Sequence, residues 1–117
     1  MEPYTLHVMT IDDYPQVKDL WMSIKGFAIR SIDDSREGVK RFIQRNPGLS
    51  VVAESEGRIV GSILCGHDGR RGCLYHVCVH PDFRRRGIGT KMVVFAMGAL
   101  RREKINKVSL IAFTKND

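Results

Sequence analysis

The most constraining feature of this sequence is the stretch of residues 75–90, which reads Tyr-His-Val-Cys-Val-His-Pro-Asp-Phe-Arg-Arg-Arg-Gly-Ile-Gly-Thr. Residues 77–79 form a short apolar run with β-branched valines, which predicts a buried strand. Pro81 ends strand pairing, because its ring nitrogen has no N–H to donate. Behind the turn, an apolar pattern with helical spacing begins, made of Ile88, Met92, Phe95, Ala96, Ala99 and Leu100. The stretch therefore predicts a strand, a tight turn and the start of a helix.

The turn before this helix combines three arginines with Gly87 and Gly89. The N-terminus of a helix presents unpaired N–H groups and the positive end of its dipole, and both favour a bound anion. Glycine lets an anion approach the backbone, because no Cβ stands in the way. The spacing is not a Walker A loop, and Met92 stands where a dinucleotide-binding fingerprint needs its third glycine. On spacing alone, an anion site and a plain turn with solvated arginines both stay open.

Residues 77–89 resemble the acetyl-CoA-binding motif of the GNAT N-acetyltransferases, which contains P-x-x-[RQ]-x-x-G-[IVL]-[GA] after a strand. The turn at residues 66–72 is also similar to that of small bacterial members. The resemblance covers most of the chain and implies the GNAT-like acyl-CoA N-acyltransferase fold, an α/β fold with a mixed sheet.

The same resemblance implies which residues bind acetyl-CoA: Val77, Cys78, Val79, Arg84, Arg85, Arg86, Gly87, Ile88, Gly89, Thr90 and Asn116. In the family pattern, the backbone of residues 77–79 holds the pantetheine and the thioester. The N–H of Val79 is then the candidate oxyanion donor. Backbone N–H groups across residues 85–90 cradle the pyrophosphate, and Arg84 stands at the Arg/Gln position. Asn116 opens the next helix of the family and bonds near the cofactor.

Length and composition agree with one globular domain over residues 1–117. A hydrophobic fraction of 43% and a charged fraction of 27% are ordinary values for such a domain. Cys65, Cys73 and Cys78 lack metal-ligand or redox spacing, so we expect reduced core thiols in a cytoplasmic protein. The net charge of +6 suits an anionic partner such as the phosphates of CoA. Neither a metal nor a membrane is expected as a partner.

Periodicity along the chain predicts the element order β-α-α-β-β-β-α-β. The expected strands cover residues 4–9, 50–54, 58–65, 73–79 and 107–113. The first helix buries Val17, Leu20, Trp21 and Ile24 and should end at Gly26. The second covers residues 36–45, capped by Asp34 or Ser35, and the third ends near residue 103.

The family pattern continues past residue 117 into another helix and strand. We expect either a longer parent chain or a partner that completes the fold, and the first is favoured because a bare last strand would expose its edge. A second copy of the chain is one candidate partner.

The implied function is transfer of the acetyl group from acetyl-CoA directly to a primary amine of a small molecule or a protein. A non-catalytic acetyl-CoA-binding regulatory module is the alternative. Nucleic-acid binding is not expected, since the basic residues come with no recognition helix or interleaved exposed aromatics.

The general base is not fixed by the motif. The positions where family members often carry a carboxylate hold Cys73 and residues near Ile111. Tyr75 and His76 are the catalytic candidates, because they precede the expected thioester, and strand alternation predicts that they face opposite sides. His76 could equally be a structural histidine, and Glu54 could act through water. Residues 27–34 form either a substrate loop or a plain helix connection.

Overall fold

The computed structural model describes residues 3–24 and 34–111 of the chain, except for the side chain of Ile111. The elements are, in order, β1 Thr5–Val8, η1 Ile11–Asp13, α1 Tyr14–Ser23, α2 Arg36–Arg45, β2 Val51–Ser55, β3 Arg58–His67, β4 Arg71–Val79, η3 Pro81–Phe83, α3 Ile88–Arg102 and β5 Lys107–Ile111. Apart from the short 3-10 helices η1 and η3, this is the predicted order, which is confirmed.

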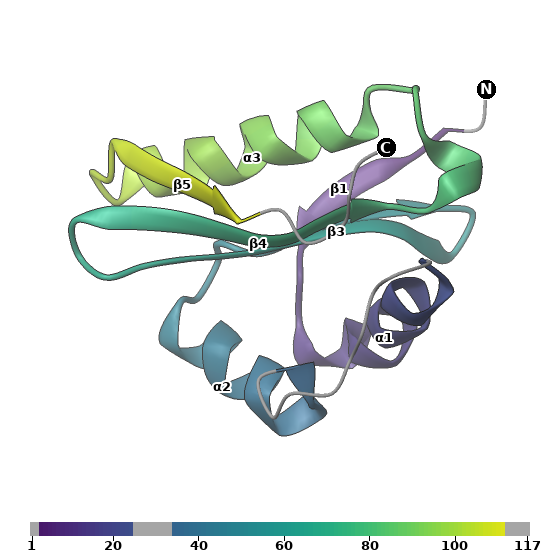
Figure 1. Ribbon diagram of the computed structural model, residues 1–117, viewed down its shortest axis with the longest axis horizontal. Coiled ribbons are helices and arrows are strands. Elements are labelled where there is room, and N and C mark those ends of the chain that lie inside the picture. Colours follow the sequence, from purple (N-terminus) through teal and green to yellow (C-terminus); the bar gives the residue numbers. More distant parts are fainter. Residues whose placement is uncertain (1–2, 25–33, 112–117) are drawn as a thin grey trace.

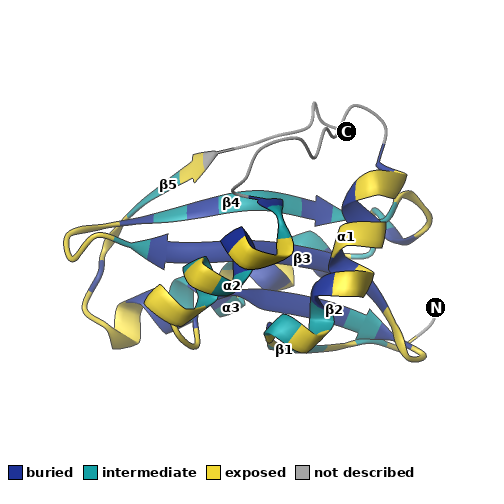
Figure 2. Cartoon of the chain, turned by 90° about the horizontal axis from the view of Figure 1, so that it is seen from below, coloured by how far each residue is buried: buried dark blue, intermediate teal, exposed yellow. Residues whose placement is uncertain are grey.

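The strands form one five-stranded mixed sheet in the order β1-β2-β3-β4-β5. The first four strands pair antiparallel, whereas β4 and β5 pair in parallel, with Arg71 opposite Lys107 and Tyr75 opposite Ile111. Helix α3 covers one face of the sheet, and α1 and α2 cover the other (Figure 1). The buried residues concentrate in the central strands and on the inner sides of the helices (Figure 2). The predicted mixed α/β class is therefore confirmed.

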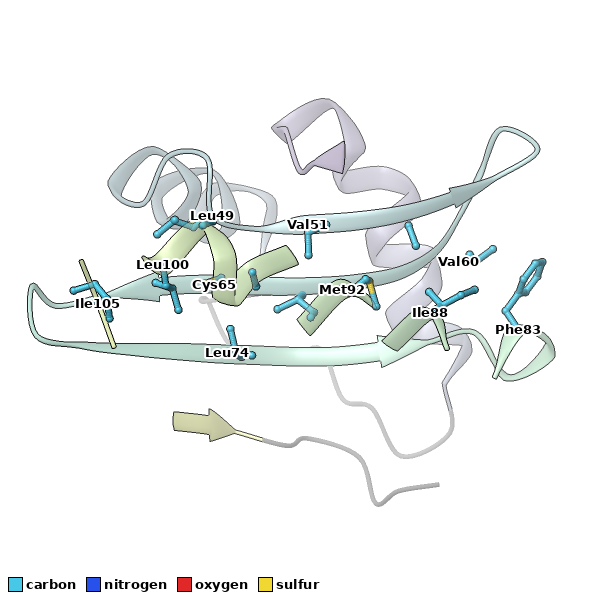
Figure 3. Packing of buried hydrophobic residues seen from close by; sticks show 14 residues of the cluster. Leu49, Val51, Val60, Cys65, Leu74, Phe83, Ile88, Met92, Leu100 and Ile105 are labelled. Atoms are coloured by element: carbon cyan, nitrogen blue, oxygen red, sulfur yellow. The ribbon is translucent and has the colours of Figure 1, made fainter. Parts of the chain in front are cut away.

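The core beneath α3 is apolar and closely packed (Figure 3). It contains Ile88, Met92, Ala96, Ala99 and Leu100 from the helix, against Val51, Val60, Ile63 and Leu74 from the strands. Two strand glycines let the helix approach the sheet. A Cβ on Gly61 would lie 2.9 Å from Met92 Cε, and one on Gly72 would lie 2.7 Å from Leu100 Cδ1. With the helix packed in this way, the N-terminus of α3 lies near the end of β4.

The second core lies between the sheet and the helices α1 and α2. Trp21 of α1 is fully buried in it, together with Val17, Val39 and Val52, and Leu64 packs in the same cluster. The helical spacing that predicted the inward face of α1 is confirmed. Ile24 follows the helix end at Ser23 and is buried too, while the predicted stop at Gly26 lies outside the described residues.

The caps of the first two helices follow local side-chain chemistry. Thr10 N donates to Asp13 Oδ2 at 2.9 Å, so the Asp13 carboxylate caps the start of η1, which leads into α1. Of the two candidates for α2, Ser35 is the cap, because its Oγ accepts from Gly38 N at 3.0 Å. Asp34 has another partner, described below.

The prediction that Tyr75 and His76 face opposite sides of the strand is wrong. The pairing of β3 with β4 shifts register between Ser62 and Leu64, and His76 has a φ of 51°. A bulge in β4 adds one residue to the strand and interrupts the alternation of its side chains. Tyr75 and His76 therefore both contact the α1–α2 side, where Tyr75 packs on Phe42 and His76 on Trp21.

No helix in the described part of the chain is long and apolar enough to cross a membrane.

Candidate active site

A cavity of about 710 Å³ lies where β4 ends and α3 begins. Its lining residues are Val77, Cys78, Val79, Pro81, Phe83, Arg84, Arg85, Gly87, Ile88, Gly89 and Thr90. This size falls in the range of about 300–1,000 Å³ that is typical of small-molecule sites. Nine of the eleven residues that the sequence predicted for the cofactor line this one cavity.

The glycine turn gives the cavity its open wall. Gly87 has a φ of 81°, in the left-handed region that glycine adopts without strain, and caps α3. At Gly89, the nearest atom to an added Cβ would be Val79 Cγ2 at 3.6 Å, an ordinary contact. The first N–H groups of α3, a helix of 15 residues, therefore border the cavity, with no Cβ at Gly87 or Gly89 to cover them. An anion fits this wall by charge and by space.

The three arginines of the motif have different positions. Arg84 Nε donates to Val79 O at 3.0 Å, which ties the turn to the end of β4 beside the cavity. Arg85 lines the cavity and is exposed. The guanidinium of Arg86 lies over the ring of Phe83, 5.0 Å from its centroid, and Arg86 is not among the lining residues. The predicted site residue Asn116 lies outside the described residues.

The peptide directions at the end of β4 bear on the oxyanion donor. His80 N donates to Val60 O of β3 at 2.8 Å. Because successive N–H groups of an extended strand point to opposite edges, the N–H of Val79 points away from β3. That edge of β4 is the one on the side of β5 and the cavity.

Cys78 lines the cavity and is itself buried. Burial raises the pKa of its thiol to about 11, although the hydrogen bond with Ser62 and the charge of Arg84 act in the opposite direction. The Ser62 Oγ to Cys78 Sγ distance is 3.4 Å. The thiol is thus protonated at neutral pH, and the nucleophilic thiolate form is suppressed.

His76 directly precedes the first lining residue, Val77, and its imidazole is held by a carboxylate. His76 Nε2 lies 2.8 Å from Asp34 Oδ1, and the two side chains are only 13% and 10% exposed. The ring of His76 also meets that of Trp21 edge to face, with centroids 4.8 Å apart. Asp34, whose backbone oxygen accepts from Tyr14 Oη at 2.7 Å, is the functional candidate that sequence reasoning missed.

Nothing in the sequence pattern pointed to Asp34 as a partner of His76. Its place before an amphipathic helix fitted a cap, and 42 residues separate it from His76. The one signal in the sequence was that Asp34 stands beside Ser35, a second cap candidate, so that only one of the two was needed for the cap.

Tyr75, the other catalytic candidate, points toward α2. Its ring packs edge to face on Phe42, with centroids 5.8 Å apart. A hydrogen bond with the thiol of Cys73 and burial raise the pKa of the Tyr75 phenol above its ordinary value. Neither Tyr75 nor His76 lines the cavity itself.

Other polar candidates have structural partners. Glu54 on β2 bonds to His7 on β1, two strands away from β4. Asp68 Oδ1 accepts from Arg70 N and Arg71 N, so it shapes the β3–β4 turn. Within the described ranges, no three His, Cys, Asp or Glu side chains are grouped to hold a metal ion. Of the expected substrate loop 27–34, only Asp34 is described.

Comparison with known proteins gives the family. A family model described as the Acetyltransferase (GNAT) family matches residues 14–117. An acetyltransferase of Sodalis glossinidius is 34% identical over 112 residues, which make up 96% of this chain and 78% of that protein. An acetyltransferase of Pectobacterium atrosepticum has the same identity and the same shares.

Solved structures agree in fold. The PaiA N-acetyltransferase from Thermoplasma acidophilum, crystallised in complex with coenzyme A, matches with a TM-score of 0.80 at 15% identity. The match covers 98% of this chain and 82% of that one. A GCN5-related N-acetyltransferase from Kribbella flavida also gives a TM-score of 0.80, at 17% identity, over 97% of this chain and 31% of that one. The chain therefore belongs to the GNAT family of acetyltransferases and is an acetyl-CoA-dependent acyltransferase.

Proposed function

We propose that this protein transfers the acetyl group of acetyl-CoA directly to a primary amine, with His76 as the general base. The observation that carries the proposal is the position of His76: its imidazole is bound to a carboxylate and directly precedes the strand residues that line the cavity. Acetyl-CoA, when bound, supplies the acetyl group as an activated thioester.

The residues of the cavity suit acetyl-CoA. The glycine turn and the first N–H groups of α3 suit the pyrophosphate, with Arg84 and Arg85 adding positive charge. Arg86 Nη1 is buried and has no acceptor among the described residues, which fits an anionic ligand that supplies one. Within this proposal Arg86 keeps its assignment as a cofactor-binding residue, as does Asn116.

The chain's own groups match the charge changes of acetyl transfer. The Val79 N–H, directed away from β3, is the proposed donor to the carbonyl oxygen as negative charge develops on it. The imidazole of His76 is the proposed acceptor of the ammonium proton, which frees the nitrogen lone pair for attack. The phenol of Tyr75, whose pKa is raised, stays protonated and is the proposed donor of a proton to the leaving thiolate.

Direct transfer is favoured over an acetylated enzyme. The cysteine that lines the cavity, Cys78, has a thiol pKa of about 11, so it lacks the thiolate character that a covalent route through sulfur needs.

The acceptor class that we propose is a primary amine carried by a small molecule or a protein. We further propose that the enzyme works in the cytoplasm, which the free thiols of all three cysteines support. A homodimer is the assembly that we propose to test, by the measurement on β5 described below.

The experiment is a release assay for the coenzyme A thiol with a panel of primary amines: a polyamine, an aminoglycoside, free amino acids, and peptides with a free α-amino group or a lysine. Matched acceptors whose amine is blocked serve as controls. We expect thiol release with one class of free amine and none with its blocked form. Binding of acetyl-CoA without turnover of any amine would contradict the proposal. Acetyl label retained on the protein would contradict direct transfer.

A further inference from the structure

We propose that Asp34 is a positioning residue for catalysis, which holds the imidazole of His76 in the tautomer and orientation that a general base needs. The inference rests on the proposed function, since it assigns the base role to His76. It adds a residue from the segment before α2 to a site otherwise built from β4 and α3.

The contact between the two side chains is short and secluded from solvent. His76 Nε2 and Asp34 Oδ1 lie 2.8 Å apart, and both side chains are nearly buried, at 13% and 10% exposed. A carboxylate withdrawn from water to this degree is costly unless it is hydrogen bonded. The His76–Asp34 pair is therefore a specific, nearly buried hydrogen bond. In exposure it differs from the ion pair of His7 and Glu54, whose side chains are 40% and 38% exposed.

Helix α1 fixes both members of the pair. Tyr14 Oη donates to the backbone oxygen of Asp34 at 2.7 Å, which holds the segment that carries the carboxylate. Trp21 packs edge to face on the imidazole, and Tyr14 packs edge to face on Trp21 with centroids 6.5 Å apart. Neighbouring aromatic rings thus restrict the rotation of the imidazole.

The backbone at His76 is adapted to this contact. A φ of 51° is uncommon for a residue other than glycine, and such outliers persist where the surrounding structure fixes them. The bulge turns His76 toward Asp34 and Trp21, while Val77 and Val79 pack against the α3 core on the other face. In a regular strand, His76 and Cys78 would face one side of the sheet and Tyr75 the other. The bulge lets Tyr75 and His76 face the same side.

The carboxylate determines the tautomer. Ionised Asp34 accepts only, so Nε2 of a neutral imidazole bonded to it carries the hydrogen, and the lone pair is on Nδ1. In the reaction, Nδ1 takes a proton from the acceptor's ammonium group and the imidazole becomes positively charged next to Asp34. The amine nitrogen then bonds to the acetyl carbon, the carbon–sulfur bond breaks, and the thiolate leaves with the electron pair. The Tyr75 phenol gives its proton to the thiolate, and the phenolate takes up the second proton that the nitrogen loses as the amide forms.

The other titratable groups around His76 are neutral near pH 7. On α1, burial and the charge of Asp34 raise the pKa of the Tyr14 phenol. On β4, the pKa values of Tyr75 and Cys78 are raised as well. Asp34 is, among the described groups, the carboxyl group in contact with the imidazole.

The kinetic test is a double-mutant cycle with Asp34→Asn, His76→Ala and the double variant, run with acetyl-CoA and the best primary amine of the panel. We expect each single variant to lose roughly 10²-fold in kcat, the usual worth of a positioned base, with little change in KM for acetyl-CoA. The double variant should be no worse than His76→Ala, because residues that act as a unit are not additive. Asp12→Asn, at an exposed acid in η1 just before α1, is the matched control and should keep the wild-type rate.

The pH–rate profile separates positioning from a purely structural role. Asp34→Asn should change the shape of the acid limb, whereas a general loss of folded protein would lower the rate equally at every pH. If His76→Ala keeps the wild-type rate, the base assignment of the proposed function fails, and this inference with it. If His76→Ala is impaired but Asp34→Asn keeps its kcat and its profile, only the inference fails.

A spectroscopic experiment can test the tautomer of His76 without any catalytic turnover. Nitrogen-15 NMR of the imidazoles in the protein without ligand should show the Nε2–H tautomer for neutral His76. Asp34→Asn offers an amide N–H to Nε2 and should increase the Nδ1–H form. A wild-type protein with the Nδ1–H tautomer, or a folded Asn variant with an unchanged one, would overturn the proposal even if no acceptor amine is found.

Discussion

Trp21 Nε1 on α1 donates a hydrogen bond to Ser62 Oγ on β3 at 3.0 Å, and both residues are fully buried. Ser62 Oγ also lies 3.4 Å from Cys78 Sγ on β4. A line of polar atoms thus crosses an otherwise apolar core and joins α1 to the strand that carries the site. Because α1 also contacts Asp34 and His76, this line helps to position the pair relative to β4.

Ser62→Ala is expected to destabilise the fold. It removes the hydroxyl that accepts from the indole N–H, and the loss of a buried hydrogen-bond partner costs about 1–3 kcal/mol. Chemical denaturation of wild type and variant measures the difference in the free energy of unfolding. The control is Ser23→Ala, whose hydroxyl donates to Leu20 O at the exposed end of α1 and should cost less. An equal loss of unfolding free energy in the two variants would show that the hydrogen bond to Trp21 does not contribute more to stability than the one to Leu20.

Gly89→Glu is expected to weaken acetyl-CoA binding at least about tenfold, which corresponds to about 1.4 kcal/mol of repulsion. The new carboxylate would stand at the N-terminus of α3, in the space and the charge environment that suit the pyrophosphate. Titration calorimetry measures the affinity. Gly89→Ala is the matched control, because its Cβ would lie 3.6 Å from Val79 Cγ2 and fits without displacement. Equal affinity in a folded Glu variant would remove the turn from the binding site.

Tyr75→Phe tests the proposed proton donor. The raised pKa of the phenol keeps it protonated through neutral and mildly alkaline pH, so the wild-type donor should not fail before the pH passes about 10. Removing the hydroxyl should lower kcat by roughly 10²-fold, the lower range for a general acid, and leave acetyl-CoA affinity unchanged. Stopped-flow release of coenzyme A measures kcat. A fully active variant would leave protonation of the thiolate to another group.

His7 gives the fold a pH dependence of its own. Burial lowers the pKa of its imidazole, but the bonds to the Val8 carbonyl and to Glu54 outweigh burial and raise it above 6.5. Its contribution to stability is therefore complete below about pH 6.5, the unfolded value, and is lost as pH rises through the raised value of the folded state. His7→Gln should thus be destabilising in urea at about pH 5.5 and nearly neutral at about pH 8.

The effect of His7 should be small, since its side chain is 40% exposed and water screens the pair. Glu54→Gln removes one partner and should reduce the same pH dependence. A difference between wild type and His7→Gln that grows with pH would contradict the assignment.

The edge of β5 is expected to mediate self-association of the 117-residue chain. Among the described strands β5 pairs only with β4, and Leu110 on it is 60% exposed. An exposed apolar edge strand is a template for pairing with another chain. Sedimentation velocity should show concentration-dependent association that Leu110→Lys reduces. Val94→Lys, at an equally exposed site on α3, is the control and should change nothing. A wild-type chain that stays monomeric at high concentration would exclude this assembly.

The sequence by itself determined the elements and most of the residues that line the cavity. Residues 75–90 give a strand, a turn and a helix because each depends on local properties: β-branched residues, a proline that cannot donate, and glycines before an apolar helical pattern. The same local properties fix the backbone of the turn, so the motif identified Gly87 and Gly89 as neighbours in one loop, and both line the cavity.

Only the tertiary structure decided which side chains meet. The bulge in β4 cannot be seen in the strand's composition, and one extra residue was enough to turn His76 to the face that Tyr75 occupies. The pairing of His76 with Asp34 joins segments 42 residues apart and depends on how α1 packs against the sheet. Periodicity and turn chemistry are properties of neighbours along the chain, whereas the environment of a catalytic side chain is set by neighbours in space.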